Sequence, residues 1–297
     1  MSFKVGFIAL IGRPNAGKST LLNQIVQHKV AIVSNKAQTT RNTIKAIRTT
    51  ADSQMIFIDT PGIHKAHHEL GRQLNRLAFS SLEGVDVIYY LLDGSKSLGL
   101  KDQYVLDLLK KQTVPVFLVL NKIDLLTKKD LIEKLMELQS MNLFEDIIPI
   151  SARDNDNIDR LLSLTEEKCP EGEKLFHEDW ALDYPEQFMI TEIIREHILH
   201  RTQEEIPHSV AVVLDSMKED KKGILIQASI IAERDSQKGI LIGKQGAMLK
   251  MVGQAAREEL EKRLQKPIFL DLLVKIEPNW RNVRRTIDQF THHDLEE

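Results

Sequence analysis

Residues 12–20 read GRPNAGKST and follow directly on the apolar run VGFIALI of residues 5–11. The stretch has the spacing G-x-x-x-x-G-K-[ST], with its fixed positions at Gly12, Gly17, Lys18 and Ser19. Glycine lets the backbone turn with positive φ and approach a polyphosphate, whose charge then meets the amides at the start of the following helix. Lys18 would reach the β- and γ-phosphates, and the hydroxyl of Ser19 would ligate Mg²⁺, which prefers oxygen ligands. The stretch therefore predicts a phosphate-binding loop between a strand and a helix.

Length and composition limit the possible classes of protein. The chain has 297 residues, 42% of them hydrophobic, which is enough for a sizeable core and favours two domains over one. The net charge of −3 predicts no nucleic-acid partner, so any such site must be local. Cys169 is the single cysteine; it excludes an intramolecular disulfide and is interpreted as a packing residue in a reducing compartment. No apolar run approaches the roughly 20 residues of a membrane-spanning helix, and the N-terminus runs straight into the phosphate loop. We expect a soluble, cytoplasmic protein and a monomer.

Short β-branched runs alternate with amphipathic stretches in the first half of the chain, which is typical of a parallel sheet wrapped by helices. We predict strands at residues 4–11, 55–60, 85–93, 114–122 and 147–152, with helical spacing clearest at 103–112 and 130–139. The pattern ends near Cys169, where the charged stretch CPEGEKLFHEDWALDYPEQ has no periodicity. The sequence thus predicts an α/β domain at 1–170, with a mostly parallel sheet and helices on both faces, a linker at 171–185, and a second domain at 186–297.

Two motifs near the predicted strand ends can complete a phosphate and metal site, because ligands bind at this edge of open α/β sheets. DTPG at residues 59–62 provides Asp59, which can bind Mg²⁺ through water, and Gly62, whose amide could contact a γ-phosphate. QTTRN at residues 38–42 provides Thr40, whose hydroxyl can complete the Mg²⁺ shell.

Two further motifs predict recognition of guanine. NKID at residues 121–124 provides Asp124, whose carboxylate can accept the two donors at the N1 and N2 edge of guanine. Adenine lacks this pair of donors, and a site built for paired polar contacts rejects a ligand without them by on the order of 10⁴. SAR at residues 151–153 would offer the Ala152 amide to guanine O6. The predicted ligands are therefore GTP or GDP with Mg²⁺.

The predicted nucleotide site is the sum of these motifs. Its nucleotide contacts are Gly12, Arg13, Pro14, Asn15, Ala16, Gly17, Lys18, Ser19, Thr20, Asp59, Thr60, Pro61, Gly62, Ile63, Asn121, Lys122, Asp124, Ser151, Ala152 and Arg153. The predicted Mg²⁺ ligands are Ser19, Thr40 and Asp59. The groups predicted to act on the reacting phosphate are Lys18, Thr40 and Gly62.

The motifs GRPNAGKS, QTTRN, DTPG, NKID and SAR, in this order, resemble those of a translation-factor-type small GTPase domain over residues 1 to about 170. The resemblance implies a P-loop GTPase that hydrolyses GTP to GDP and phosphate. Small signalling GTPases position the attacking water with a glutamine after DxxG, but this chain has Ile63, whose alkyl side chain can neither donate nor accept. We therefore expect slow intrinsic hydrolysis that depends on a partner or a cation.

Two ion sites besides Mg²⁺ remain open from the sequence. In related GTPases that lack the glutamine, an asparagine at the position of Asn15 helps to hold K⁺ between the phosphates; the alternative is that Asn15 only shapes the loop. His64, His67 and His68 could form a metal site, although closely spaced histidines in a predicted loop are more often solvated.

The second domain has a different order of elements. A helix is predicted at 188–202 and strands at 209–217, 223–232 and 268–276, with GKQG at 243–246 between two helical patterns. This order resembles a type II KH domain, in which the G-x-x-G turn clamps the backbone of single-stranded RNA. Lys244 supplies charge, and Ile240, Ile242 and Met248 could face the bases. Taken alone, the turn could equally be a helix breaker.

The C-terminal stretch WRNVRRTIDQF at 280–290 is a candidate extension of the RNA site. Arg281 and Arg285 are four residues apart and would share a helical face for phosphates, while Trp280 could stack on a base. The alternative is a tryptophan packed on the core beneath solvated arginines. The predicted RNA contacts are Ile242, Gly243, Lys244, Gln245, Gly246, Trp280, Arg281, Arg284 and Arg285.

One GTPase domain joined to a type II KH domain resembles the Era family of ribosome-assembly GTPases over essentially the whole chain, and the stretches DYPEQFMITEIIREHIL, EEIPHSV and VKIEPNWR strengthen the resemblance. It implies binding to the 3′ end of 16S ribosomal RNA and to the 30S subunit during maturation, with peripheral association to the inner membrane surface. An RNA-binding scaffold with a decayed nucleotide site would need a broken phosphate loop. An assembly factor with two GTPase domains would need a second GKS and NKxD, and this chain has one of each.

Overall fold

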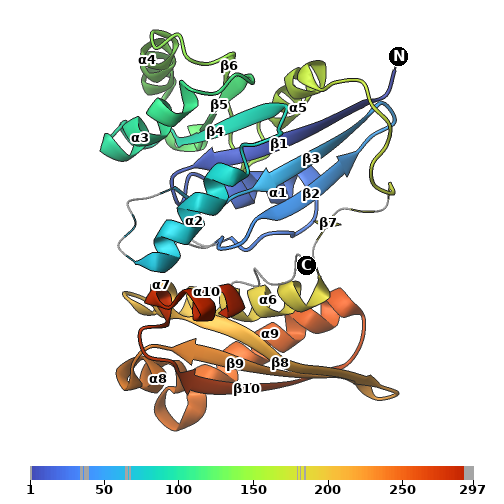
Figure 1. The fold of residues 1–297 in the computed structure, drawn as a ribbon, viewed down its shortest axis with the longest axis vertical. Helices are drawn as coiled ribbons and strands as arrows, with labels where there is room; N and C mark the ends of the chain where they lie inside the picture. The colour runs from blue at the N-terminus through green and yellow to red at the C-terminus, as the bar shows by residue number, and fades with distance from the viewer. Residues whose placement is uncertain are drawn as a thin grey trace. The chain divides into compact units, whose positions relative to one another are not determined.

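The computed structural model describes residues 2–33, 36, 40–63, 66, 68–178, 180, 182–183 and 185–290. The chain divides into two compact units (Figure 1). The first comprises Met1–Val33, Thr40–His67 and Gly71–Asp183, and the second is formed mainly by Tyr184–Glu297. Residues 171–183, which the sequence assigns to a linker, thus group with the first unit.

The first unit contains a seven-stranded sheet with the order β6-β5-β4-β1-β3-β2-β7. Its five parallel strands are β1 (Lys4–Gly12), β3 (Ser53–Asp59), β4 (Val87–Asp93), β5 (Val116–Asn121) and β6 (Asp146–Pro149). They confirm the predicted, mostly parallel sheet. Two antiparallel strands that the sequence pattern does not predict extend it: β2 (Ile44–Thr49) pairs with β3, and β7 (Leu182–Asp183) pairs with β2.

Helices surround this sheet (Figure 1). They are α1 (Lys18–Val26), α2 (Glu69–Ser80), α3 (Leu100–Leu109), α4 (Lys128–Gln139) and α5 (Ile158–Lys168), with a 3₁₀ turn, η1 (Ile123–Leu125), after β5. Ala9 and Ile11 of β1 belong to a core cluster with residues of α2, α3 and α4. Ile8 and Leu10 are equally buried, and successive strand residues point to opposite faces. Every residue of β3, β4 and β5 is also buried, so the sheet is covered on both faces, as expected for a parallel sheet.

The second unit contains a three-stranded sheet with β9 (Gly223–Ala232) at its centre. β8 (Ala211–Asp220) is antiparallel and β10 (Ile268–Ile276) is parallel to β9. The helices are α6 (Glu186–Arg201), α7 (Ile206–Ser209), α8 (Asp235–Ile242), α9 (Ala247–Leu264) and α10 (Arg284–Phe290), with 3₁₀ turns η2 (Lys244–Gly246) and η3 (Trp280–Asn282). A single cluster of buried Ile, Val, Leu and Ala side chains joins α6, α8 and α9 to all three strands. The predicted order of a helix, two strands, two helices around GKQG and a last strand is confirmed.

The helices of both units are too short or too polar to span a bilayer, as far as the structure describes them.

Candidate nucleotide-binding and RNA-binding sites

The phosphate loop leaves the end of β1 and enters α1, as the sequence predicts. Gly12 has φ +154°, and a Cβ there would lie 2.5 Å from the carbonyl oxygen of Leu91. Gly17 has φ +99°, and a Cβ there would lie 2.1 Å from Asn121 Nδ2. Both glycines are therefore required by the backbone and by the neighbouring strands. Because neither glycine has a side chain, the loop backbone can lie directly against β4 and β5.

Lys18 begins α1 and is buried at the mouth of the loop. Its Nζ donates to the carbonyl oxygens of Gly12 and Arg13, at 3.3 and 3.5 Å. Burial lowers the pKa of Lys18, while the nearby Asp59 carboxylate opposes this shift. A buried ammonium beside a cradle of backbone amides is a strong site for a polyanion.

The three predicted Mg²⁺ ligands lie together. Ser19 Oγ donates to Asp59 Oδ2 at 2.8 Å and lies 3.0 Å from Thr40 Oγ1, and Thr40 Oγ1 donates to Asp59 Oδ2 at 3.3 Å. Asp59 is fully buried, and its Oδ1 has no hydrogen-bond partner among the described residues. Burial raises the pKa of Asp59, against the charge of Lys18 and the hydrogen bonds from Ser19 and Thr40. An unpaired buried carboxylate oxygen beside two hydroxyls is an all-oxygen donor set, so these residues fit Mg²⁺.

The residues around Thr40 and Gly62 are described in part. Gln38, Thr39, His64 and His67 lie outside the described residues, whereas Arg41, Asn42 and His68 are within them. Among the described residues, no group of three His, Cys, Asp or Glu side chains could hold a metal ion.

The DTPG segment is anchored to the phosphate loop. Thr60 Oγ1 donates to Leu10 O at 2.7 Å, and Ile63 N donates to Gly12 O at 3.2 Å. A Cβ on Gly62 would lie 2.8–2.9 Å from Pro14, so only glycine fits against the loop here. The Ile63 side chain is buried in the core cluster under α2 and α3. It therefore offers no polar group to a water molecule at this position.

The NKID motif joins three parts of the site. Asn121 Nδ2 donates to Ala16 O at 2.9 Å, and its Oδ1 accepts from the amides of Lys122 and Ala152 at 2.8 and 3.0 Å. Lys122 Nζ donates to Asn15 O and to Asp93 Oδ2, both at 2.7 Å. The side chains of Asn121 and Lys122 thus tie the phosphate loop to the ends of β4 and β5.

Asp124 lies at the same edge of the sheet, beside the SAR motif. Ser151 Oγ donates to its Oδ1 at 2.7 Å, and Arg153 Nη2 lies 3.1 Å from its Oδ2. Each carboxylate oxygen can accept a second bond, so the donors of a guanine base could still be received here. The Ala152 amide, predicted to meet guanine O6, donates to Asn121 Oδ1 in this structure.

The structure adds residues that the motifs do not identify. Asp102, at the start of α3, accepts from Arg13 Nη1 at 2.8 Å, so the side chain of Arg13 is directed to α3. Asp93 at the end of β4 holds Lys122. Asp93 could have been found as a carboxylate at a strand end, while Asp102 resembles an ordinary helix-capping residue three positions after Gly99. Nothing in the sequence links Asp102 to the loop.

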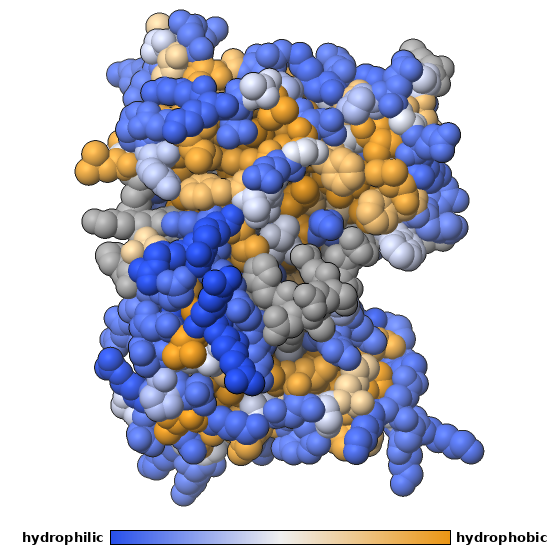
Figure 2. Space-filling model, viewed as in Figure 1, coloured by the Kyte–Doolittle hydropathy of each residue, from blue (hydrophilic) through white to orange (hydrophobic). Residues whose placement is uncertain are grey.

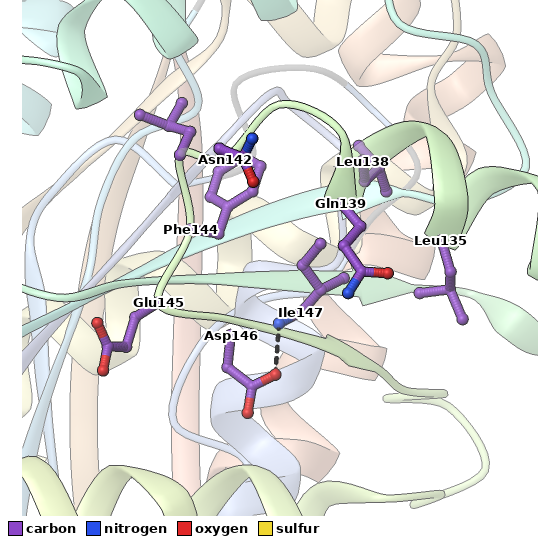
Figure 3. Close-up of a pocket in the computed structure, with 9 residues that line it drawn as sticks. Leu135, Leu138, Gln139, Asn142, Phe144, Glu145, Asp146 and Ile147 are labelled. Atoms are coloured by element: carbon purple, nitrogen blue, oxygen red, sulfur yellow. Dashed lines mark hydrogen bonds between the residues drawn. The ribbon is translucent and has the colours of Figure 1, made fainter.

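A separate pocket of about 400 Å³ lies between the end of α4 and β6 (Figure 3). Its lining includes Leu135, Leu138, Phe144 and Ile147, with Asp146 bonded to the amide of Ile147. None of the predicted site residues lines it. Its edge strand is short and ends in Pro149, features that discourage pairing with another strand.

The backbone of the GKQG turn in the second unit adopts a conformation that glycine favours. Gly243, Gln245 and Gly246 have φ of +73°, +52° and +79°, and Lys244 and Gln245 are exposed. A Cβ on Gly243 would lie 2.8 Å from Met248 Cβ, so this glycine is needed to join α8 to α9. Ile242 and Met248 are partly buried against the core, whereas Ile240 is exposed.

The prediction that Trp280 stacks on a base is wrong. The ring is fully buried, its Nε1 donates to Ser209 O at 2.9 Å, and it meets Phe290 edge-on at 5.6 Å between centroids. The alternative interpretation, a tryptophan packed on the domain core, is the one that the structure supports.

The predicted helical face of Arg281 and Arg285 is also wrong. η3 ends at Asn282, Val283 has extended backbone angles, and α10 starts at Arg284, so no single helix carries both arginines. Arg281 Nη2 lies 2.5 Å from Glu233 Oε2 in a mostly buried ion pair. Arg284 and Arg285 are exposed, and their contact with RNA stays a prediction.

Both units resemble known proteins. Residues 7–122 match a family described as 50S ribosome-binding GTPase, and residues 205–281 match the KH domain family. A point variant of Era from Aquifex aeolicus bound to GDP and AlF4⁻ is 37% identical, with a TM-score of 0.93 over 97% of this chain and 99% of that chain. Era in complex with MgGDPNP and nucleotides 1506–1542 of 16S ribosomal RNA is also 37% identical, with a TM-score of 0.94 over 97% of this chain and 98% of that chain.

Proposed function

Because the chain belongs to the Era family of GTPases, we propose that it is a GTP-hydrolysing switch protein that binds the 3′ end of 16S ribosomal RNA and the small ribosomal subunit and assists its maturation. One observation carries the nucleotide part of this proposal. A phosphate loop, an oxygen donor set that fits Mg²⁺ and the carboxylate of Asp124 lie at one edge of a single sheet. The RNA part rests on the KH domain and on the relative solved with 16S ribosomal RNA.

The reaction would be in-line attack of water on the γ-phosphorus of GTP. Lys18 would leave its two loop carbonyls for the phosphates and stabilise the negative charge that spreads over their oxygens. Mg²⁺, when held by Ser19, Thr40 and Asp59, would neutralise charge on the same phosphates. The buried alkyl group of Ile63 has no means of orienting water, so we propose a low basal rate that a cation or partner raises.

Guanine recognition is tested at Asp124. Asp124→Asn replaces an acceptor by a donor, so the variant should bind GTP more weakly and xanthosine triphosphate more tightly than the wild type. Titration with both nucleotides measures this, and the xanthine nucleotide controls for misfolding of the variant. An unchanged preference for GTP would overturn the assignment.

We propose K⁺ as the activating cation, coordinated in part by Asn15. Asn15 lies in the loop at φ +66°, with its carbonyl held by Lys122. Single-turnover hydrolysis should be faster in KCl than in NaCl at equal ionic strength. Asn15→Gly keeps the left-handed backbone accessible and should remove the difference while leaving GDP affinity largely intact. Equal wild-type rates in the two salts would instead point to RNA or ribosome contact as the activator.

RNA binding through GKQG is tested by charge reversal. Lys244→Asp with Gln245→Asp should strongly weaken binding to a 16S 3′-end RNA and reduce the salt dependence of the binding that remains, while basal GTP hydrolysis is retained. Lys221→Asp with Lys222→Asp is the control, because these exposed lysines lie on the β8–β9 turn of the same unit and their replacement makes the unit at least as negative. Wild-type RNA affinity in the GKQG variant by filter binding would reduce this turn to a structural role.

The remaining parts of the proposal concern the location of the protein in the cell and its partners there. The family resemblance suggests association with the 30S subunit, a cytoplasmic location and peripheral contact with the inner membrane surface. Co-sedimentation with 30S subunits, and with vesicles of anionic phospholipid, measures the two contacts separately. Protein that stays in the supernatant in either experiment would exclude that contact.

A further inference from the structure

The side chain of Arg13 connects the phosphate loop to α3. Its Nη1 lies 2.8 Å from Asp102 Oδ2. Asp102 is 1% exposed, although it lies between Leu100 and Tyr104, which are 93% and 54% exposed on the outer face of α3. Apolar surface is visible in the region of α3 (Figure 2). The carboxylate of Asp102 is therefore turned inward, toward the loop and the sheet.

Asp102 accepts hydrogen bonds from three directions. Arg13 and the Gly99 amide donate to Oδ2, the latter at 2.9 Å, and the Tyr90 hydroxyl of β4 donates to Oδ1 at 3.3 Å. Burial raises the pKa of Tyr90, and the charge of Asp102 adds to this effect, so the phenol remains a neutral donor. Three donors from three segments fix the carboxylate, and Arg13 is the cation that balances its buried charge.

We infer that Asp102 is a positioning residue for GTP hydrolysis, which fixes residues 12–15 of the phosphate loop through Arg13. The inference rests on the proposed GTPase function. The loop is held at a second point by Lys122, which bonds Asn15 O and Asp93. Pro14 lies between these two anchors, and a Cβ on Gly62 would come within 2.8–2.9 Å of it, so Pro14 packs closely beside the DTPG segment. Loss of the Arg13 anchor would thus shift the part of the loop that faces the γ-phosphate and the DTPG segment.

Such a shift should affect rate more than affinity. The backbone amides at the start of α1 would hold the other phosphates, and the loop before them is anchored independently, because Asn121 Nδ2 donates to Ala16 O. A misplacement of about 1 Å can cost on the order of 100-fold in rate. We therefore expect single-turnover hydrolysis to fall by about 10- to 100-fold in Arg13→Met and in Asp102→Asn, while GDP affinity changes by less than about fivefold.

The experiment compares the single variants with the double variant Arg13→Met/Asp102→Asn. Arg13→Met leaves the buried carboxylate of Asp102 without its cation, and Asp102→Asn leaves the guanidinium of Arg13 without its carboxylate, so each should lower Tm. The double variant has no buried charge at this point and should recover Tm. The side-chain oxygen introduced by Asp102→Asn can still accept from the Gly99 amide, so the start of α3 keeps its cap. If Asp102 positions the loop, the double variant recovers stability but still hydrolyses GTP slowly. Arg13→Lys, which keeps a cation beside Asp102, should hydrolyse GTP faster than Arg13→Met.

Two outcomes would overturn the inference. Hydrolysis that recovers together with Tm in the double variant would mean that the pair serves stability alone. Wild-type rates in the single variants would mean that the loop does not need this anchor. Asp107→Asn, at an exposed ion pair with Lys110 on the same helix, is the control and should hydrolyse GTP normally. If the wild type and this control also fail to hydrolyse GTP, the proposed GTPase function is wrong, independently of Asp102.

Discussion

Replacement of Gly17 by alanine should weaken nucleotide binding through two costs that the structure separates. The first is backbone strain, because an L-residue in left-handed backbone at φ +99° costs about 1–2 kcal/mol. The second is displacement of Asn121, because the new Cβ would lie 2.1 Å from Nδ2, which donates to Ala16 O. Loss of that buried hydrogen bond costs about 0.5–1.5 kcal/mol.

Together the two costs are about 1.5–3.5 kcal/mol. The unliganded loop can relax to relieve them, and nucleotide binding must then restore the strained conformation, so affinity should fall by roughly 10- to 300-fold. Titration of a fluorescent GDP analogue measures the affinity, and calorimetry measures Tm. Gly84→Ala is the matched control, because Gly84 also has positive φ, at +71°, but a Cβ there meets nothing within 4 Å. The control should lose stability and keep wild-type affinity. Affinity of Gly17→Ala within twofold of wild type would refute the reasoning.

Three further predictions concern charge, packing and metal. Burial raises the pKa of Asp93, but hydrogen bonds from Lys122 and Ser95 outweigh this, so the pKa in the folded state is lowered. The ionised carboxylate of Asp93 therefore stabilises the fold above about pH 4, and this contribution is lost as the pH falls. Lys122→Met should therefore lower Tm most at pH 7, and the difference should shrink as the pH falls through 4; a difference in Tm that is independent of pH would contradict this. Trp280→Phe loses the bond to Ser209 and should lower the free energy of unfolding by about 1–3 kcal/mol in urea titrations, with RNA affinity unchanged; weaker RNA binding by the folded variant would return Trp280 to the interface. Asp59→Asn removes the one carboxylate of the metal set, so GTP affinity should lose most of its dependence on Mg²⁺, measured by titration with and without EDTA, and a retained dependence would exclude Asp59 as a ligand.

Much of the fold follows from local sequence pattern. The five parallel strands are continuous apolar runs, buried on both faces, and such runs are visible without a structure. β2 and β7 are not marked by such continuous apolar runs. β7 is two residues long and exists only through its pairing with β2, more than 130 positions earlier in the chain, so no local signal could indicate it.

The functional site, like the fold, was predictable only where local sequence motifs determine it. Motif residues at strand ends converge because the carboxyl ends of parallel strands meet at one edge, and Ser19, Thr40 and Asp59 accordingly lie together. The contact of Arg13 with Asp102 joins positions 89 residues apart through two side-chain orientations, which no spacing encodes. Trp280 illustrates the converse error. A tryptophan beside arginines has the composition of an RNA-stacking patch, and only its packing against Phe290 and Ser209 reveals a core residue.

The single thiol of the chain provides a built-in reporter of native-state opening. Cys169 caps the end of α5 with its sulfur packed against Gly6 of β1, and it is only 4% exposed. Burial raises its pKa to about 11, so at pH 8 the thiolate, which is the form that reacts with an alkylating reagent, is a minor species. Alkylation of the folded protein should therefore be slow, and separation of the end of α5 from β1 should accelerate it. Its rate, followed by the mass of the intact chain with and without GDP, measures how often the first unit opens and how strongly nucleotide suppresses that opening, without any engineered label.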